Sequence, residues 1–116
     1  MPNRFVMTAL FLLCIAGSAN AAMISGKFLL STLESEDPRM KLQGEGFVIG
    51  VTDTITSKAL SKYCFQFKKG MEAADVISAV RSYLKRHPED LKYSASTQVA
   101  KALFNAFPES ACGATD

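Results

Sequence analysis

The stretch GFVIGVTDTIT, residues 46–56, decides the fold class, because it is compatible with either a strand or a helix. Its β-branched residues favour a strand over 47–51. The apolar residues of the wider segment, however, lie on one broad face at helical spacing over a length unusual for a strand. These residues are Met40, Phe47, Val48, Val51 and Ile55. We therefore predict a helix over residues 39–57.

The segments on either side of this stretch also carry apolar residues at helical spacing, which predicts three further helices. The first covers about residues 23–35 and places Ile24, Phe28, Leu29 and Leu33 at helical spacing. The other two cover about 71–86 and 95–107, and the last follows Ser94, a residue type that commonly caps helices. Residues 58–70 lack this pattern and form a connector. The sequence thus predicts an all-α fold, a small bundle of four to five helices.

The first residues have the three parts of an export signal. Arg4 precedes an apolar run over 5–17, and small residues follow at the positions that signal peptidase reads. The run is too short to cross a bilayer as a helix. We predict a cleaved signal peptide over 1–21 and one exported domain over 22–116, with an uncleaved amphipathic anchor as the alternative.

The charge balance excludes two classes of partner. The whole chain has a formal net charge of +2, which falls to about +1 once Arg4 is removed. A nearly neutral domain has no electrostatic footprint for nucleic acid or for an anionic membrane surface. We therefore expect no nucleic-acid partner, and no membrane partner after cleavage.

Two of the three cysteines remain in the predicted mature chain, Cys64 and Cys112. An even pair in an oxidising compartment predicts one disulfide. A disulfide between Cys64 and Cys112 would close the long loop between them and would stabilise the domain by roughly 4 kcal/mol in the chain-entropy model. The alternatives, a reactive thiol or half of a metal site, lack a nearby histidine or a C-x-x-C spacing.

The only histidine of the chain lies in the stretch YLKRHPEDL, residues 83–91. Basic residues suit the negative end of a helix, and Pro88 cannot continue that helix, so a helix end explains His87. A general base would need a reacting partner, and a zinc site would need more ligands. We predict no catalytic residue, no metal and no cofactor. An exposed loop that contacts a partner is the alternative for this stretch.

Gly46 and Gly50 lie four residues apart and thus on one face of the predicted helix. Each costs about 1 kcal/mol relative to alanine inside a helix. A close contact should offset that cost. We expect either packing against the alanines of the last helix or the seam of a dimer. The alanines are Ala100, Ala102 and Ala106.

Several short motifs, taken together, resemble the exported immunity proteins of the Tai and Rap kind, which protect bacteria from type VI secretion amidase effectors. The matching residues are Gly46-Phe47-Val48-Ile49-Gly50-Val51-Thr52-Asp53, Cys64, Val80, Tyr83-Leu84, His87-Pro88-Glu89, Leu91, Val99-Ala100, Ala102-Leu103 and Ala106-Phe107-Pro108. The resemblance implies a small all-helical periplasmic protein, commonly a homodimer. It also implies that the protein is not an enzyme but binds a cell-wall amidase and blocks its papain-like cysteine active site.

Such inhibition needs a rigid segment that enters the cleft of the partner. We predict the loop over residues 87–93, with five contact residues: His87, Glu89, Asp90, Lys92 and Tyr93. The lysine-rich connector over 58–69 is the second choice. A periplasmic stress chaperone of the small helical one-disulfide kind is the alternative function, and an inhibitor of the lysozyme type is a third.

Overall fold

The computed structural model describes residues 23–57, 65–67 and 70–110. The predicted signal peptide, 1–21, lies outside these residues. So do Cys64 and Cys112 and most of the connector that was the second choice for partner contact. The predicted disulfide therefore stays a prediction.

The described residues form four α-helices and two short 3-10 turns, with no strand among them. The α-helices are α2 (Gly26–Leu33), α3 (Pro38–Thr56), α4 (Ala73–Arg86) and α5 (Ala95–Ala106), and the turns are η2 (Pro88–Asp90) and η3 (Pro108–Ser110). The stretch 46–56 lies inside α3, so the prediction of a helix there is correct. The predicted all-α class is confirmed. None of the described helices is both long enough and apolar enough to cross a membrane.

Short polar side chains and a proline determine where the first two helices begin. The hydroxyl of Ser25 accepts a hydrogen bond from the Phe28 N–H, 3.2 Å away, at the start of α2. The carboxylate of Asp37 accepts one from the Arg39 N–H at 2.9 Å, and Pro38 occupies the first position of α3. These groups satisfy N–H donors that have no partner within the helix.

The predicted capping residue of α5 is at the expected position but does not cap through its side chain. Ser94 precedes the first residue of α5, yet its hydroxyl makes no bond to the N–H groups of the helix. It lies 2.9 Å from the hydroxyl of Ser96 instead. The sequence thus predicted where α5 begins, but not the contact that the side chain makes.

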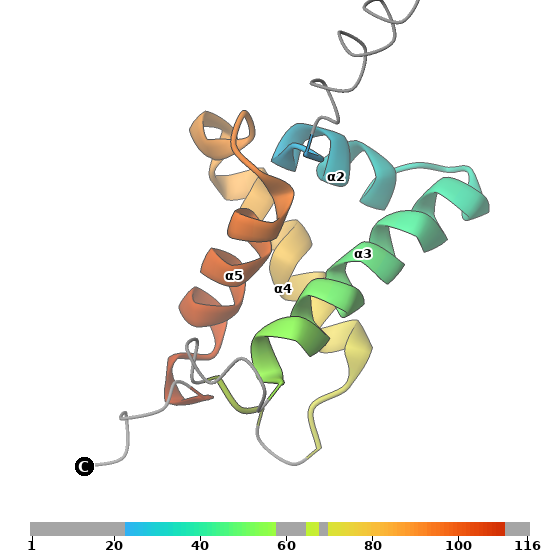
Figure 1. The fold of residues 1–116 in the computed structure, drawn as a ribbon. Coiled ribbons are helices and arrows are strands. Elements are labelled where there is room, and N and C mark those ends of the chain that lie inside the picture. The colour runs from blue at the N-terminus through green and yellow to red at the C-terminus, as the bar shows by residue number, and fades with distance from the viewer. Residues whose placement is uncertain (1–22, 58–64, 68–69, 111–116) are drawn as a thin grey trace, which may run out of the picture.

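Side chains from all four helices form one core. It contains Leu29 and Leu33 of α2, Val48 and Ile55 of α3, Val76, Val80, Tyr83 and Leu84 of α4, and Ala95, Val99, Ala102 and Leu103 of α5. Phe65, from the connector, is also buried, and its ring meets those of Phe67 and Phe104 edge to face at 5.0 and 5.1 Å. Figure 1 shows α2 at one end of the bundle, beside the connection from α4 to α5.

The buried side of α3 is rotated from the predicted face. Its buried residues are Gly44, Val48, Thr52 and Ile55. Phe47 and Val51 are only partly buried and pack against the edge of the core. The pattern of apolar residues missed Thr52, which can be buried because its hydroxyl donates to the Val48 carbonyl oxygen at 2.7 Å.

Candidate partner-binding surface

The loop over residues 87–93 begins directly at the end of α4. His87 is the C-terminal cap of that helix, and its backbone N–H donates to the Tyr83 carbonyl oxygen at 3.1 Å. The ring Nδ1 lies 2.8 Å from the same oxygen, and because a carbonyl only accepts, Nδ1 is the donor. The ring also stacks on Tyr83, with centroids 4.0 Å apart. The helix-end interpretation of His87 is therefore correct.

Consecutive tight turns keep the loop compact. The Asp90 N–H donates to the His87 carbonyl oxygen at 3.0 Å, and the Tyr93 N–H donates to the Asp90 carbonyl oxygen at 3.0 Å. Pro88 begins the 3-10 turn between them and fixes one backbone dihedral. A loop with this much internal bonding has little conformational freedom to lose on binding.

The start of α2 holds the far side of the loop. The Gly26 N–H donates to the Tyr93 carbonyl oxygen and the Lys27 N–H donates to the Leu91 carbonyl oxygen, both at 2.8 Å. In return, the Ala95 N–H donates to the Ile24 carbonyl oxygen at 2.7 Å. The free N–H groups of a helix start are thus satisfied by the loop. Sequence reasoning missed this pairing, since backbone groups leave no signal in a sequence pattern.

The five predicted contact residues differ in exposure. Glu89 and Lys92 are exposed, and Tyr93 keeps 51% of its surface in solvent. The Lys92 ammonium lies 5.2 Å from the centre of the Tyr93 ring, a cation–π arrangement. Asp90 is partly buried, with a carboxylate oxygen 4.0 Å from the Lys101 ammonium. The loop therefore presents a carboxylate, an ammonium and an amphipathic ring to solvent.

Apolar residues of α2 and of the segment just before it extend this surface. The sequence pattern placed two of them, Ile24 and Phe28, among the apolar residues of the first helix. Ile24 and Phe28 are 40% and 48% exposed, and Met23 before them is 80% exposed. Leu29 and Leu33 of the same predicted pattern are buried, together with Gly26 and Thr32. A helix of two turns has too few residues for its spacing to show which side faces the core.

Among the described residues, Gly46 and Gly50 do not pack closely against the alanines of the last helix, so the seam of a dimer stays the prediction for this pair. A Cβ atom added at either position would meet no described atom within 4 Å. The close crossing occurs at Gly44, where an added Cβ would overlap the hydroxyl of Thr32 on α2. Spacing alone did not indicate Gly44, because all three glycines lie in the same helix and only the fold shows which one lies at the crossing with α2.

Hollows on two sides of α3 have no charged side chain among their described lining residues. A groove of about 520 Å³ between α3 and α5 is lined by Phe47, Gly50, Val51, Thr54, Ile55, Ser96, Thr97 and Ala100. A hollow of about 250 Å³ between α2 and α3 is lined by Ile24, Phe28, Leu29, Thr32, Gln43, Gly44 and Phe47. Phe47 belongs to both, so the two hollows form one apolar strip along α3. Such a strip suits another apolar surface.

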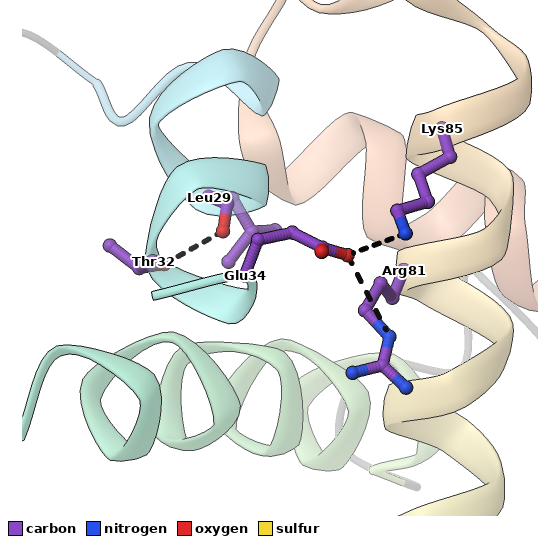
Figure 2. Close-up of polar contacts among 5 residues, drawn as sticks. All are labelled: Leu29, Thr32, Glu34, Arg81 and Lys85. Carbon is purple, nitrogen blue, oxygen red and sulfur yellow. Dashed lines mark hydrogen bonds and ion pairs between the residues drawn. The ribbon is translucent and has the colours of Figure 1, made fainter. Parts of the chain in front are cut away.

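Ion pairs join the end of α2 to α4. Figure 2 shows Glu34 reaching toward two basic side chains of α4: its carboxylate lies 3.0 Å from the Lys85 ammonium and 4.0 Å from the Arg81 guanidinium. All three side chains are more than a third exposed, so the contribution to stability is small. Within the described residues, His, Cys, Asp and Glu form no group of three or more that could hold a metal ion.

Comparison with known proteins gives one match. A family model described as Rap1a immunity proteins matches residues 13–109. No curated protein and no solved structure matches the chain. The matched range contains α2, α3, α4 and α5 and the 87–93 loop.

Proposed function

Because the chain belongs to the family of Rap1a immunity proteins, we propose that it binds and inhibits a peptidoglycan amidase that bacteria deliver by type VI secretion. The target in this proposal is a papain-like cysteine hydrolase, as the resemblance of the sequence implies. The chain itself catalyses nothing and needs no cofactor. It acts in the periplasm, where it protects the cell wall from the effector.

The rigid attachment of the 87–93 loop carries the proposal. An inhibitory segment must hold its shape, since any freedom that it loses on binding subtracts from the affinity. Here bonds within the loop and bonds from the start of α2 fix the backbone before any partner arrives. The exposed side chains of Glu89, Lys92 and Tyr93 then supply contacts to the cleft.

Asp90 and His87 have a supporting role in this proposal. The His87 ring is stacked on Tyr83 and bonded to its carbonyl oxygen, so it fixes the angle at which the loop leaves α4. Asp90 lies 4.0 Å from Lys101 and ties the loop to α5. In this proposal, the contacts with the amidase are therefore made mainly by Glu89, Lys92 and Tyr93.

We also propose that two copies of the chain pair through the face of α3 that carries Gly46 and Gly50. These glycines are exposed, and an added Cβ would meet no described atom there, so a second helix can approach closely. The adjoining groove between α3 and α5 is mostly apolar, and none of its described lining residues is charged. An apolar groove on each copy could be covered by the other copy in a symmetric homodimer.

The predicted disulfide between Cys64 and Cys112 remains part of the proposal. Support comes from a neighbouring contact: the Gln66 N–H donates to the Ser110 carbonyl oxygen at 2.8 Å. Gln66 and Ser110 are each two residues from one of the cysteines, so this bond joins the two segments that carry them. Alkylation of free thiols, before and after reduction, followed by mass measurement of the exported chain, tests the pairing.

Charge reversal in the loop tests the proposed function. We expect Glu89→Lys to weaken binding to a secreted cell-wall amidase while the thermal midpoint stays near that of the wild type, because Glu89 is exposed. Adding Asp90→Lys should weaken binding further. Glu36→Lys, an exposed carboxylate in the turn before α3, is the matched control and should bind normally. Unchanged affinity in the loop variants would reject this loop as the contact.

A further inference from the structure

Gly26 occupies the point where α2 and the candidate loop come closest. It is the first residue of α2, it is buried, and its N–H bonds the Tyr93 carbonyl oxygen at 2.8 Å. We propose that Gly26 is a positioning residue, which sets the distance between α2 and the 87–93 loop and so the orientation in which the loop meets its partner. This inference rests on the proposed function.

The space around Gly26 shows why a side chain matters there. An added Cβ would lie 3.3 Å from both the Cα and the carbonyl oxygen of Leu91, and 3.2 Å from the Gln98 Cγ. Contacts of this length require the neighbour to shift by a few tenths of an ångström. The affected oxygen of Leu91 is the same atom that accepts the Lys27 N–H. A methyl group at residue 26 therefore presses directly on one of the bonds that hold the loop.

The loop is the neighbour that can move. Gln98 is fully buried in α5, where it is enclosed by the core, whereas Leu91 is only partly buried at the surface. Alanine is also a better helix former than glycine, which favours α2 and offsets the crowding. Gly26→Ala should therefore keep the fold and displace the loop.

A binding measurement separates positioning from a merely structural role. The probe is a secreted papain-like cell-wall amidase that the wild type inhibits. We expect Gly26→Ala to raise the dissociation constant about tenfold, mainly through faster dissociation, with a thermal midpoint near that of the wild type. Ser78→Ala, at an exposed position of α4, is the control and should bind like the wild type. Equal affinity of Gly26→Ala and wild type would overturn the inference.

Rescue by a second substitution provides the sharper test. Gln98→Ala removes the Cγ atom on the other side of residue 26, so α2 can shift toward α5 and the loop can return to its place. The double variant Gly26→Ala with Gln98→Ala should therefore regain affinity, although it loses stability because a buried side chain is truncated. Gln98→Ala alone should bind like the wild type. An affinity that simply follows the stability of the variants would refute a positioning role.

Hydrogen exchange of the free protein tests the same inference without any partner. The Lys27 amide donates to Leu91, so its exchange should be several-fold faster in Gly26→Ala and unchanged in Ser78→Ala. Unchanged exchange of Lys27 would contradict the inference even if no amidase were bound. A wild type that binds no amidase, with faster Lys27 exchange in the variant, would instead reject the proposed function and retain the positioning of the loop.

Discussion

The crossing of α2 and α3 at Gly44 gives a prediction about stability that the structure makes quantitative. A Cβ added at Gly44 would overlap the Thr32 hydroxyl and would lie 3.1 Å from the Thr32 Cβ and 3.3 Å from the Leu33 Cδ2. Thr32 is 1% exposed, and its hydroxyl donates to the Leu29 carbonyl oxygen at 2.7 Å, as Figure 2 shows. Gly44→Ala must therefore move a buried side chain that already has a hydrogen bond.

The size of the effect follows from three contributions. Overpacking of a core costs about 1–3 kcal/mol. Displacement of the Thr32 hydroxyl costs about 1 kcal/mol for the lost hydrogen bond. Replacing glycine by alanine inside a helix stabilises the folded state by about 1 kcal/mol. Gly44→Ala should thus lower the free energy of unfolding by about 1–3 kcal/mol.

Gly46→Ala and Gly50→Ala are matched controls in the same helix. Within one copy neither added methyl group would meet a described atom, so in the unpaired chain only the helix propensity changes. Each variant should then gain up to about 1 kcal/mol when unfolding is measured on the monomer. Denaturant unfolding of the exported, oxidised protein at equal concentrations measures all three. Gly44→Ala should unfold at the lowest denaturant concentration of the three. The dependence of the unfolding free energy on denaturant concentration should be the same in all three variants.

A second-site change identifies the cause. Thr32→Ala removes the hydroxyl that the new methyl group would overlap, although the Cβ at residue 32 and the Leu33 side chain stay. Gly44→Ala should therefore be less destabilising in that background than in the wild type. Gly44→Ala as stable as Gly46→Ala would refute the reasoning about the crossing. A loss that Thr32→Ala does not reduce would show that the contact is not its origin.

Three further predictions concern other parts of the surface and core. Gly50→Lys should leave the monomer folded but abolish the proposed dimer, so light scattering after gel filtration should give a monomer mass; a dimer mass would exclude this face. Gln98→Met should raise the free energy of unfolding by about 1–3 kcal/mol, because both polar atoms of the buried Gln98 amide lack a partner within the described part of the chain; a lower midpoint in denaturant would contradict this. Glu34→Gln should lower stability by less than about 1 kcal/mol, with the difference from wild type shrinking in high salt, since its ion pairs to α4 are solvent-exposed; a difference independent of salt would argue against the ion pairs.

The helices could be predicted from the sequence because their signals are local. Apolar residues at helical spacing located all four, and Pro38 and the residues before Pro88 marked where helices begin and end. The 47–51 segment forms a helix despite its β-branched residues, since Val48 is buried in the core and Phe47 and Val51 pack against its edge at helical spacing. The boundaries agree to within a few residues.

The close contacts could not be predicted, because they depend on the crossing of elements that are distant in sequence. Gly44 rather than Gly46 or Gly50 lies at the crossing with α2, and nothing in the spacing distinguishes them. Backbone bonds from Gly26 and Lys27 hold the loop, and these bonds leave no trace in side-chain patterns. The loop itself was predicted from Pro88 and its charged neighbours, whereas its attachment to α2 needed the fold.

The central claim is that a loop held rigid by α2 and α4 blocks the active site of a cell-wall amidase. Titration of the exported, oxidised chain into a papain-like type VI amidase effector, with release of peptidoglycan fragments as the readout, tests it most directly. We predict stoichiometric loss of activity with the wild type and retained activity with the variant that carries Glu89→Lys and Asp90→Lys. Full hydrolysis at saturating wild-type protein, or equal inhibition by the loop variant, would contradict the account.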